Sequence, residues 1–393
     1  MGRLGYLSYA RKIFWKRNTS PVYVVFFITN RCNARCKHCL LGSGELPADD
    51  LTIDEIEKIS RGMDDFLFLL PTGGQPFLRK DLGEIVKIFH RNNHVRNVGI
   101  PTNGTMTERT VEIAYDILES CPGLDFGIDV SIDALGEDHD SIRGVPGLFE
   151  KAVHTYKELK KLQRFYPKFN VNVETTVSAY NDDKLIPLHD YLVNDLKVDT
   201  LFTLLTRGKP KDPSSKFFNI DKYEKYSKVL KKDIRDRTLS GYSTFPFCDF
   251  INAKRVVRHD LISRTVKENR YQTPCYAGRL GAAIFAQGDV LPCELHTEMV
   301  MGNLRENDYD FKKIWFGPKA DEFRKSIINE KCFCTYECFH TVNILFNPRM
   351  LPRVFKEWAS IKRGKAAHRI RRVLTRVRGS KKLIKEGPVQ IGR

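Results

Sequence analysis

Short apolar runs alternate with amphipathic stretches between residues 22 and 205. Runs that are apolar on both faces and are separated by helices are typical of a parallel sheet covered by helices. The predicted strands are Val22–Thr29, Phe66–Leu70, Val98–Pro101, Phe126–Asp133, Phe169–Val177 and Thr200–Leu205. The predicted helices are Ile53–Arg61, Leu82–His90, Glu108–Leu118, Gly147–Leu162 and Lys184–Leu196. Six such units predict an α/β fold built on a partial (βα)6 TIM-like barrel, with its chemistry at the carboxyl ends of the strands.

The alternation stops after the sixth predicted strand. Residues 207–218, which contain two prolines and two serines, predict a connection, and a helix over Asp221–Arg235 follows it. Five cysteines farther along the chain predict a small second domain. The predicted segments are a basic aromatic N-terminal helix at 1–20, the barrel at 21–208, a connecting helical segment at 209–270, a small cysteine-rich domain at 271–345 and a basic amphipathic tail at 346–393.

The positive charge of the chain is concentrated at its two ends. The net charge is +17, of which +13 lies in residues 349–393 and +5 in residues 1–18, so the residues between them are nearly neutral. An enzyme that acts on nucleic acid is expected to have a basic active-site face, so this distribution disfavours nucleic acid as a partner. Basic residues beside aromatic ones favour an anionic membrane surface at both ends. The alternatives are nucleic acid or an acidic protein partner for the tail, and a helix packed on the body for the N-terminal segment.

The composition bears on the compartment and on the use of the cysteines. The chain has 393 residues, of which 41% are hydrophobic, but no apolar run reaches the length of a membrane span and the N-terminus lacks the apolar region of a signal peptide. Ten cysteines without an export signal favour metal ligation over disulfides. We therefore expect a cytoplasmic protein that is peripheral at the membrane through its basic ends.

Cys32, Cys36 and Cys39 follow the first predicted strand at spacings of four and three. A loop at the end of a strand lets three thiols converge on one centre. Structural zinc takes four ligands, and no fourth Cys or His of suitable geometry stands beside these three, since His38 is wedged between Lys37 and Cys39. Thiolates also bind iron–sulfur clusters, and a four-iron cluster held by three of them retains one open iron.

This Cys-x-x-x-Cys-x-x-Cys loop resembles the signature of the radical S-adenosylmethionine superfamily. The resemblance implies that Cys32, Cys36 and Cys39 hold a catalytic 4Fe-4S cluster, whose open iron is chelated by S-adenosylmethionine. It also implies reductive cleavage of S-adenosylmethionine to a 5′-deoxyadenosyl radical, which abstracts a hydrogen atom from a substrate, and an electron donor such as flavodoxin or ferredoxin. A structural zinc loop or three unrelated thiols are the alternatives.

Two further motifs fall at predicted strand ends and are similar to motifs of this superfamily. The segment Gly73-Gly74-Gln75-Pro76 is similar to the Gly-Gly-Glu-Pro motif, which holds the amino group of S-adenosylmethionine, although Gln75 replaces the usual Glu. Asn103, before a glycine, looks like the turn that ends the third strand of the family. Both motifs are also common as plain tight turns.

The fourth predicted strand places Asp129, Ser131 and Asp133 on one face, where buried polar groups need partners. The resemblance extends to the loop over residues 136–144, and it implies that Ser131 and Asp133 face the ribose of the cofactor and that Arg143 binds its carboxylate. The alternative for Arg143 is a surface ion pair with Asp138 or Asp140.

The second set of cysteines is Cys275, Cys293, Cys332, Cys334 and Cys338. A predicted hairpin that turns at Gln287–Asp289 would bring Cys293 back towards Cys275. The arrangement resembles the SPASM and twitch domains, which implies one auxiliary 4Fe-4S cluster held by four of the five thiols, with Cys275 and Cys293 among them. A zinc site is the alternative.

Two further cysteines and one glutamate are also considered. Cys248 is an outside candidate for the second site, and Cys121 is predicted to be a core thiol. Glu294 follows Cys293 directly, and in some SPASM enzymes an acidic residue at the matching place takes a proton from the substrate. The alternative for Glu294 is an exposed charge on the hairpin.

The leading functional hypothesis is a radical S-adenosylmethionine enzyme whose auxiliary cluster assists oxidation of the substrate. Because the chain ends are typical of membrane-seeking segments, the substrate is expected to be a lipid, a lipid-linked sugar or a sugar alcohol. One alternative is a maturase of a ribosomal peptide. The other is a non-catalytic iron–sulfur or zinc protein that acts in electron transfer or regulation.

Overall fold

The structure is a computed structural model that describes residues 12, 19–41, 49–242 and 247–365. Most of the predicted N-terminal helix and the tail beyond residue 365 lie outside the described residues. The membrane surface predicted from these two ends therefore stays a prediction, as do the segment boundaries.

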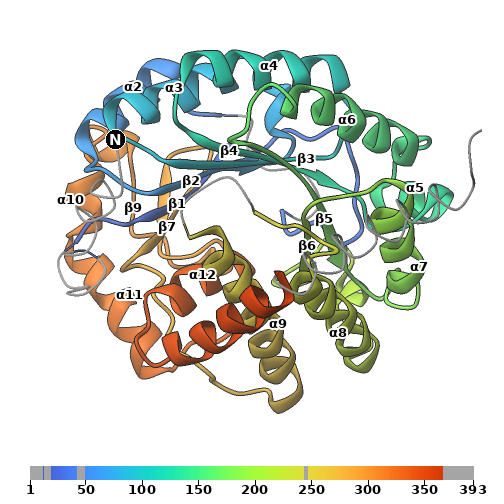
Figure 1. The fold of residues 1–393 in the computed structure, drawn as a ribbon. Helices are drawn as coiled ribbons and strands as arrows, with labels where there is room; N and C mark the ends of the chain where they lie inside the picture. Colours follow the sequence, from blue (N-terminus) through green and yellow to red (C-terminus); the bar gives the residue numbers. More distant parts are fainter. Residues whose placement is uncertain (1–11, 13–18, 42–48, 243–246, 366–393) are drawn as a thin grey trace, which may run out of the picture.

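A nine-stranded sheet forms the centre of the described structure, in the order β6-β5-β4-β3-β2-β1-β7-β8-β9 (Figure 1). Strands β1 to β6 are parallel, which confirms the predicted six-stranded partial barrel. Their bounds are β1 Tyr23–Thr29, β2 Phe68–Gly73, β3 Asn97–Thr102, β4 Asp125–Ser131, β5 Phe169–Val177 and β6 Leu201–Leu205. The predicted strands matched these bounds to within three residues, because strands buried on both faces leave long apolar runs.

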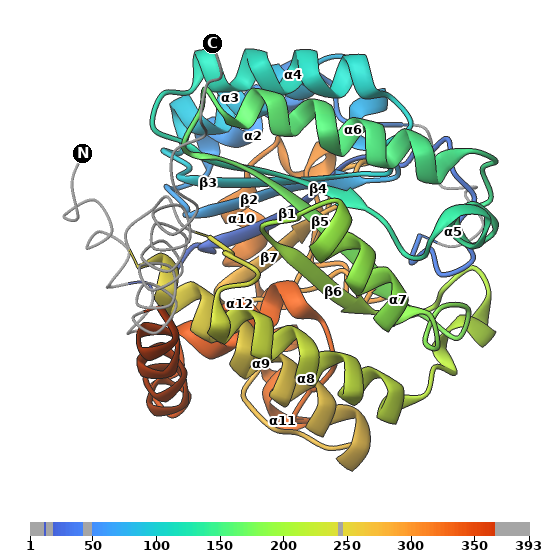
Figure 2. The ribbon, with the colours of Figure 1, turned by 45° about the vertical axis from the view of Figure 1, so that its right-hand side comes forward.

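Helices α2, α3, α4 and α6 cover the outer face of the sheet in both views (Figures 1 and 2). The helices of the barrel are α2 Ile53–Gly62, α3 Leu82–Asn92, α4 Thr107–Ser120, α5 Gly136–Arg143, α6 Leu148–Gln163 and α7 Leu185–Asp190. A π-helical turn over Tyr191–Asp195 continues α7. Apolar side chains of the outer face, such as those of Phe26 and Ile128, form the main core with these helices, and Cys121 is buried there as predicted.

The cysteine-rich domain extends the sheet of the barrel. Strand β7 (Gly281–Ile284) pairs in parallel with β1, and β8 (Asp289–Leu291) returns antiparallel to it, as the predicted hairpin requires. Gly288 has φ +98° in the turn, a conformation that favours glycine. The remaining elements are β9 Gly302–Asn303, α10 Phe311–Trp315, α11 Pro318–Asn329 and α12 Glu337–Leu345.

The inner face of the sheet is covered by α8 (Ile220–Asp236), α9 (Cys248–Glu268) and α12 (Figure 2). The sequence predicted α8 but no separate helix for α9, because buried residues surround α9 on nearly all sides and leave no amphipathic pattern. A last helix over residues 351–365 packs on α9 through Val354 and Ile361. Within the described ranges, no helix is long and apolar enough to cross a membrane.

Candidate functional site

The first cysteine loop follows β1 and lies at the carboxyl end of the barrel. Cys32 is exposed, and Cys36 and Cys39 are half-buried. Burial raises the pKa of Cys36 to about 11 against the opposing charge of Arg143, and the Cys39 and Cys32 thiols add to the increase. The three thiols are therefore close enough to interact. Three thiols on one loop at a strand end are a donor set that fits an iron–sulfur cluster.

Gly73 and Gly74 let the end of β2 pack directly against this loop. The amide of Gly74 donates to the carbonyl of Thr29 (2.9 Å), and the amide of Gln75 donates to the carbonyl of Arg31 (2.8 Å). A Cβ on Gly73 would lie 2.0 Å from the Thr29 carbonyl oxygen, and one on Gly74 would lie 2.1 Å from that of Arg31. Only glycine fits these two positions, so they fix the cysteine loop on the barrel.

Gln75 and Asn103 form a second polar connection beneath the loop. The buried Gln75 side chain donates to Thr102 Oγ1 (3.0 Å) and accepts from the amide of Asn103 (3.2 Å). Asn103 Nδ2 in turn donates to Asn33 Oδ1 in the cysteine loop (2.8 Å). Both side chains thus join the ends of neighbouring strands, and their predicted contacts with the cofactor stay predictions.

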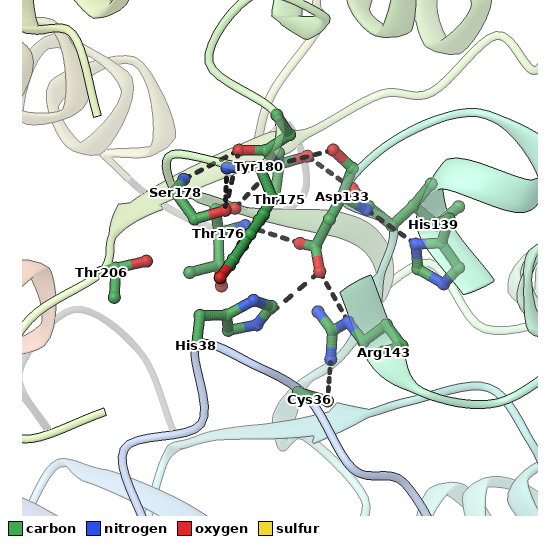
Figure 3. A network of polar contacts seen from close by, with 12 residues as sticks. Cys36, His38, Asp133, His139, Arg143, Thr175, Thr176, Ser178, Tyr180 and Thr206 are labelled. Atoms are coloured by element: carbon green, nitrogen blue, oxygen red, sulfur yellow. Dashed lines mark hydrogen bonds and ion pairs between the residues drawn. The ribbon is translucent and has the colours of Figure 1, made fainter. Parts of the chain in front are cut away.

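Asp133 lies just past the end of β4 at the centre of a buried network (Figure 3). Its Oδ2 pairs with Arg143 Nε (2.6 Å), and its Oδ1 accepts from the amide of Thr176 (2.8 Å). Burial opposes ionisation, but Arg143 and the nearby histidines lower the pKa of Asp133 to about 2. The network is therefore charged and paired within the protein.

This network also holds the cysteine loop. The carbonyl of Arg143 accepts from the amide of Arg35 (2.9 Å), and Arg143 Nη1 points at Cys36 Sγ (3.9 Å; Figure 3). The structure does not pair Arg143 with either of the aspartates proposed from the sequence, since its carboxylate partner is Asp133. His38 lies 3.7 Å from Asp133, and burial lowers the pKa of His38 to about 4, so its imidazole is neutral.

Four of the five C-terminal cysteines interact with one another. Cys275 and Cys332 share a hydrogen bond, and the charges of Cys293 and Cys334 both act on Cys275. Cys332 Sγ also contacts His296 Nε2 (3.4 Å). In the part of the chain that is described, no three His, Cys, Asp or Glu side chains are arranged to hold a single metal ion. A four-iron cluster differs, because its thiolates bind separate iron atoms.

The fifth C-terminal thiol is that of Cys338. It faces a cavity of about 660 Å³, which runs along the inner side of β2 to β6 and is closed by α9 and α12. Burial raises the pKa of Cys338 to about 12, and the charges of Glu294 and Arg207 also act on it. This thiol therefore belongs to the wall of the cavity.

Arg207 connects the two domains at this cavity. Its Nη1 pairs with Glu337 Oε2 (3.0 Å) and its Nη2 with Glu294 Oε1 (3.4 Å). Glu294 is 7% exposed, so it is not the exposed hairpin charge of the sequence alternative. Burial raises the pKa of Glu294, and Arg207 opposes the shift. Sequence analysis did not single out Glu337, because an acid between two cysteines carries no pattern of its own.

Two more carboxyl groups line the cavity from the barrel side. Asn172 Nδ2 donates to Asp129 Oδ1 (2.7 Å), and burial raises the pKa of Asp129 to about 6. Burial and the neighbouring Asp129 raise the pKa of Glu174 to about 8. Ser131, which pairs with Glu174 across β4 and β5, is buried nearby.

Comparison with known families gives two matches. Residues 26–191 match the radical SAM superfamily, and residues 275–339 match the SPASM iron–sulfur cluster-binding domain. The first match contains the Cys32 loop, both glycines and the Asp133 network. The second contains all five C-terminal cysteines.

Several curated proteins are similar over most of this chain. The AdoMet-dependent heme synthase of Methanosarcina barkeri is 28% identical over 78% of this chain and 84% of its own length. The pre-heme d1 synthase of Dinoroseobacter shibae is 25% identical over 77% of this chain and 75% of its own. The subtilosin biosynthesis protein AlbA of Bacillus subtilis is 23% identical over 79% of this chain and 65% of its own.

Solved structures share the fold. SuiB of Streptococcus suis bound to S-adenosylmethionine has a TM-score of 0.55 and 16% identity, over 82% of this chain and 71% of that one. The enzyme anSMEcpe with bound AdoMet has a TM-score of 0.56 and 16% identity, over 89% of this chain and 100% of that one. At this identity the likeness supports the architecture alone.

Proposed function

Because this chain is a radical S-adenosylmethionine enzyme with a C-terminal SPASM iron–sulfur domain, we propose that it oxidises a bulky substrate bound in the cavity between barrel and SPASM domain. When bound, S-adenosylmethionine and its 4Fe-4S cluster supply a radical that abstracts a hydrogen atom from the substrate. The observation that carries the proposal is the position of this cavity, whose walls include Glu174 of the barrel and Glu294 and Cys338 of the SPASM domain.

Each part of the site has a proposed task. Cys32, Cys36 and Cys39 hold the catalytic cluster, and Gly73 and Gly74 shape its loop. The remaining residues proposed to face S-adenosylmethionine are Gln75, Asn103, Ser131, Asp133 and Arg143. Asp133 acts by holding Arg143 in place, because both of its oxygens already have partners within the protein.

On the substrate side, Glu294 is proposed to accept the proton that leaves the oxidised carbon, because it is buried in the cavity wall next to Cys293. Arg207 orients this carboxylate through the contact at 3.4 Å. An auxiliary 4Fe-4S cluster beside Cys293 supplies an acceptor for the electron.

We assign the auxiliary cluster to Cys275, Cys293, Cys332 and Cys334, which interact with one another, and leave Cys338 as a cavity thiol. Iron analysis of anaerobically reconstituted protein tests this assignment. Cys334→Ala is expected to lose about half of the bound iron, since one of two clusters is lost, whereas Cys338→Ala retains it. Loss of iron from Cys338→Ala and retention by Cys334→Ala would reverse the assignment.

The names of the relatives favour a tetrapyrrole substrate. Both of the more similar relatives are named for heme synthesis, and the cavity is large and mostly lined by apolar side chains. A ribosomal peptide is the second candidate, favoured by the similarity to the subtilosin biosynthesis protein. The lipid or lipid-linked sugar expected from the chain ends, and a flavodoxin or ferredoxin as electron donor, stay predictions.

Formation of 5′-deoxyadenosine tests the proposed function. Anaerobically reconstituted protein is incubated with dithionite and S-adenosylmethionine, and the nucleoside is measured by chromatography. The wild-type protein and Cys248→Ser are expected to form it, because Cys248 begins α9, away from the cysteine loop. Cys36→Ala is expected to form none. Absence of the nucleoside from wild-type protein that contains both clusters would refute the proposal and favour a non-catalytic iron–sulfur protein.

A further inference from the structure

One wall of the cavity is formed by a helix whose sequence is typical of a basic surface. The middle of α9, residues 253–259, contains one lysine, two arginines and a histidine, yet every residue in this stretch is buried. Isolated charges are rarely buried, because removal from water is unfavourable unless a partner replaces the lost hydration. The partners of these cations therefore indicate what the helix is built to do.

Arg255 has partners within the protein. Its Nη2 donates to the carbonyl of Leu201 (2.6 Å), its Nη1 to Asn252 Oδ1 (3.3 Å), and its guanidinium lies over the ring of Phe202. It thereby attaches α9 to strand β6. Arg255 does not line the cavity, and it explains the burial of one cation by an ordinary structural role.

Lys254 and Arg258 differ from Arg255, because both line the cavity. They are four residues apart and so lie on one face of the helix. Each is only 5% exposed. Lys254 Nζ donates to the neutral hydroxyl of Thr341 (3.1 Å), and in the described part of the chain Nε and Nη2 of Arg258 have no hydrogen-bond partner.

The carboxylate of Glu337 does not compensate for these two side chains. Glu337 acts on Arg258 electrostatically, but its Oε2 pairs with Arg207 (3.0 Å) and its Oε1 accepts from the amide of Leu205 (3.0 Å). Burial, with the charges of Arg258 and Arg255, lowers the pKa of Lys254 well below its usual value. The cavity wall thus contains two adjacent basic side chains, and one of them, Arg258, has buried donors without a partner within the described residues.

The cavity wall also contains many apolar side chains, and some of its aromatic rings are exposed. Phe247 and Phe355 line it and are 66% and 53% exposed, and Phe250 packs against Phe355 with ring centroids 5.2 Å apart. A volume of about 660 Å³ is in the range of small-molecule sites. The complementary ligand has a broad apolar body and an anionic group.

We propose that Lys254 and Arg258 bind a carboxylate of the substrate, while its apolar body lies in the cavity along the inner face of the sheet. The guanidinium of Arg258 offers the planar pair of donors that a carboxylate accepts in bidentate fashion. This inference rests on the proposed function, and it specifies the substrate class as a carboxylic acid with a large apolar body. A porphyrin with carboxylate side chains and a long-chain fatty acid both have this chemistry.

Binding of two such acids tests the proposal without turnover. Coproporphyrin III and oleate are titrated into anaerobically reconstituted full-length protein without reductant, and binding is followed by porphyrin fluorescence or by calorimetry. Arg258→Gln and Lys254→Met are expected to lower the affinity for the acid that binds by roughly ten- to hundredfold, because charge-assisted hydrogen bonds are lost. Arg258→Lys, which retains the charge, is expected to weaken it less.

The matched control is Arg264→Gln. Arg264 is on the same helix but is exposed and pairs with Glu268 (3.2 Å). This variant is expected to bind like the wild type. The tetramethyl ester of coproporphyrin III, which retains the ring but has no carboxylate, is expected to bind wild-type protein as weakly as the acid binds Arg258→Gln. Preference for coproporphyrin over oleate assigns the carboxylate to a tetrapyrrole, and the reverse preference assigns it to a lipid.

Thermal unfolding separates a binding role from a structural one. Removal of a buried cation without a partner is expected to leave the melting temperature of the ligand-free protein unchanged or higher, and the increase caused by the bound acid is expected to disappear. The proposal is overturned if neither acid binds the wild type, if ester and acid bind equally, or if Arg258→Gln binds like the wild type. Formation of 5′-deoxyadenosine is measured in the same preparations. If Arg258→Gln binds the acid like the wild type and 5′-deoxyadenosine is formed, only this inference is refuted. If the wild type forms no 5′-deoxyadenosine, the proposed function is refuted.

Discussion

Charged groups at the cofactor end of the barrel have partners within the protein, whereas some of those in its interior do not. Asp133, past the end of β4, is fully buried, and Glu174, on the neighbouring strand β5, is half-buried in the cavity wall. Asp133 has Arg143 at 2.6 Å and a pKa of about 2. Within the described residues the side chain of Glu174 makes no hydrogen bond or ion pair, and burial and Asp129 raise its pKa to about 8. Burial acts to raise the pKa of both carboxyls, so the neighbouring charges decide the difference between them.

The same contrast separates the other polar groups of the two regions. At the cofactor end, the side chains of Gln75 and Asn103 bond to neighbouring strand ends and so preorganise the loop before any ligand binds. In the interior, Nε and Nη2 of Arg258 lack such partners within the described residues. Paired groups indicate scaffolding, and unpaired groups in a cavity wall indicate a place for a ligand.

Of the substitutions that test this contrast, removal of Arg143 is expected to have the largest effect on the free energy of unfolding. Arg143→Ala leaves Asp133 as a buried charge without its cation, and breaking a buried pair on one side destabilises a protein by about 3–5 kcal/mol. The loop at Cys36 also loses the contact with the guanidinium. Urea unfolding of the cluster-free protein measures the change.

The control for Arg143 is an ion pair that another residue of the same helix makes. Lys184 pairs with Asp138 of α5 at 2.6 Å, but both side chains are partly exposed. Lys184→Ala is expected to change the free energy of unfolding by less than about 1 kcal/mol. Equal effects of the two substitutions would contradict the view that the Asp133 pair is structural.

Glu174→Gln is expected to have an intermediate effect that depends on pH. The pKa of Glu174 in the folded protein is about 8, which is above the pKa of a carboxyl in the unfolded chain. Protonation of Glu174 therefore contributes to the free energy of unfolding, and this contribution is lost as the pH rises towards 8. Between pH 6 and pH 9 the free energy of unfolding of the wild-type protein should therefore fall by about 2–3 kcal/mol more than that of Glu174→Gln. Denaturant unfolding at both values measures it.

A variant on the surface controls for general effects of pH. Glu150 is exposed on α6, and Glu150→Gln is expected to follow the wild type at both pH values. If Glu174→Gln also follows the wild type, the carboxyl has a partner in solution and the two regions do not differ in the way described.

The regions also differ in how far they could be predicted. The cofactor end follows from local sequence, because three cysteines, two glycines and alternating polar residues at strand ends each leave a pattern within a few positions. Confirmed predictions such as β5, the hairpin at Gly288 and the buried Cys121 depend on equally local rules.

The interior depends on contacts between distant parts of the chain. Arg207 meets Glu337 across 130 positions, and Cys338 of α12 lines the cavity together with residues of strands β2 to β6. Helix α9 was missed because burial on all sides removes the periodicity that marks a helix. A basic run that is buried is indistinguishable in sequence from one at a surface.

The smallest expected effect is that of Gln75, and it tests whether the paired region is only scaffolding. In Gln75→Ala the amide of Asn103 and the hydroxyl of Thr102 lose buried partners. Because an unsatisfied buried donor is unfavourable, the free energy of unfolding should fall by about 1–2 kcal/mol. Gln75→Glu is the second variant, because its carboxylate can still accept a hydrogen bond from the amide of Asn103. Its affinity for S-adenosylmethionine, measured by equilibrium dialysis, should therefore change less than about threefold, or about 0.7 kcal/mol. If Gln75→Ala instead retains full stability but binds S-adenosylmethionine at least tenfold more weakly, Gln75 contacts the cofactor directly, and the cofactor end also contains groups that await a ligand.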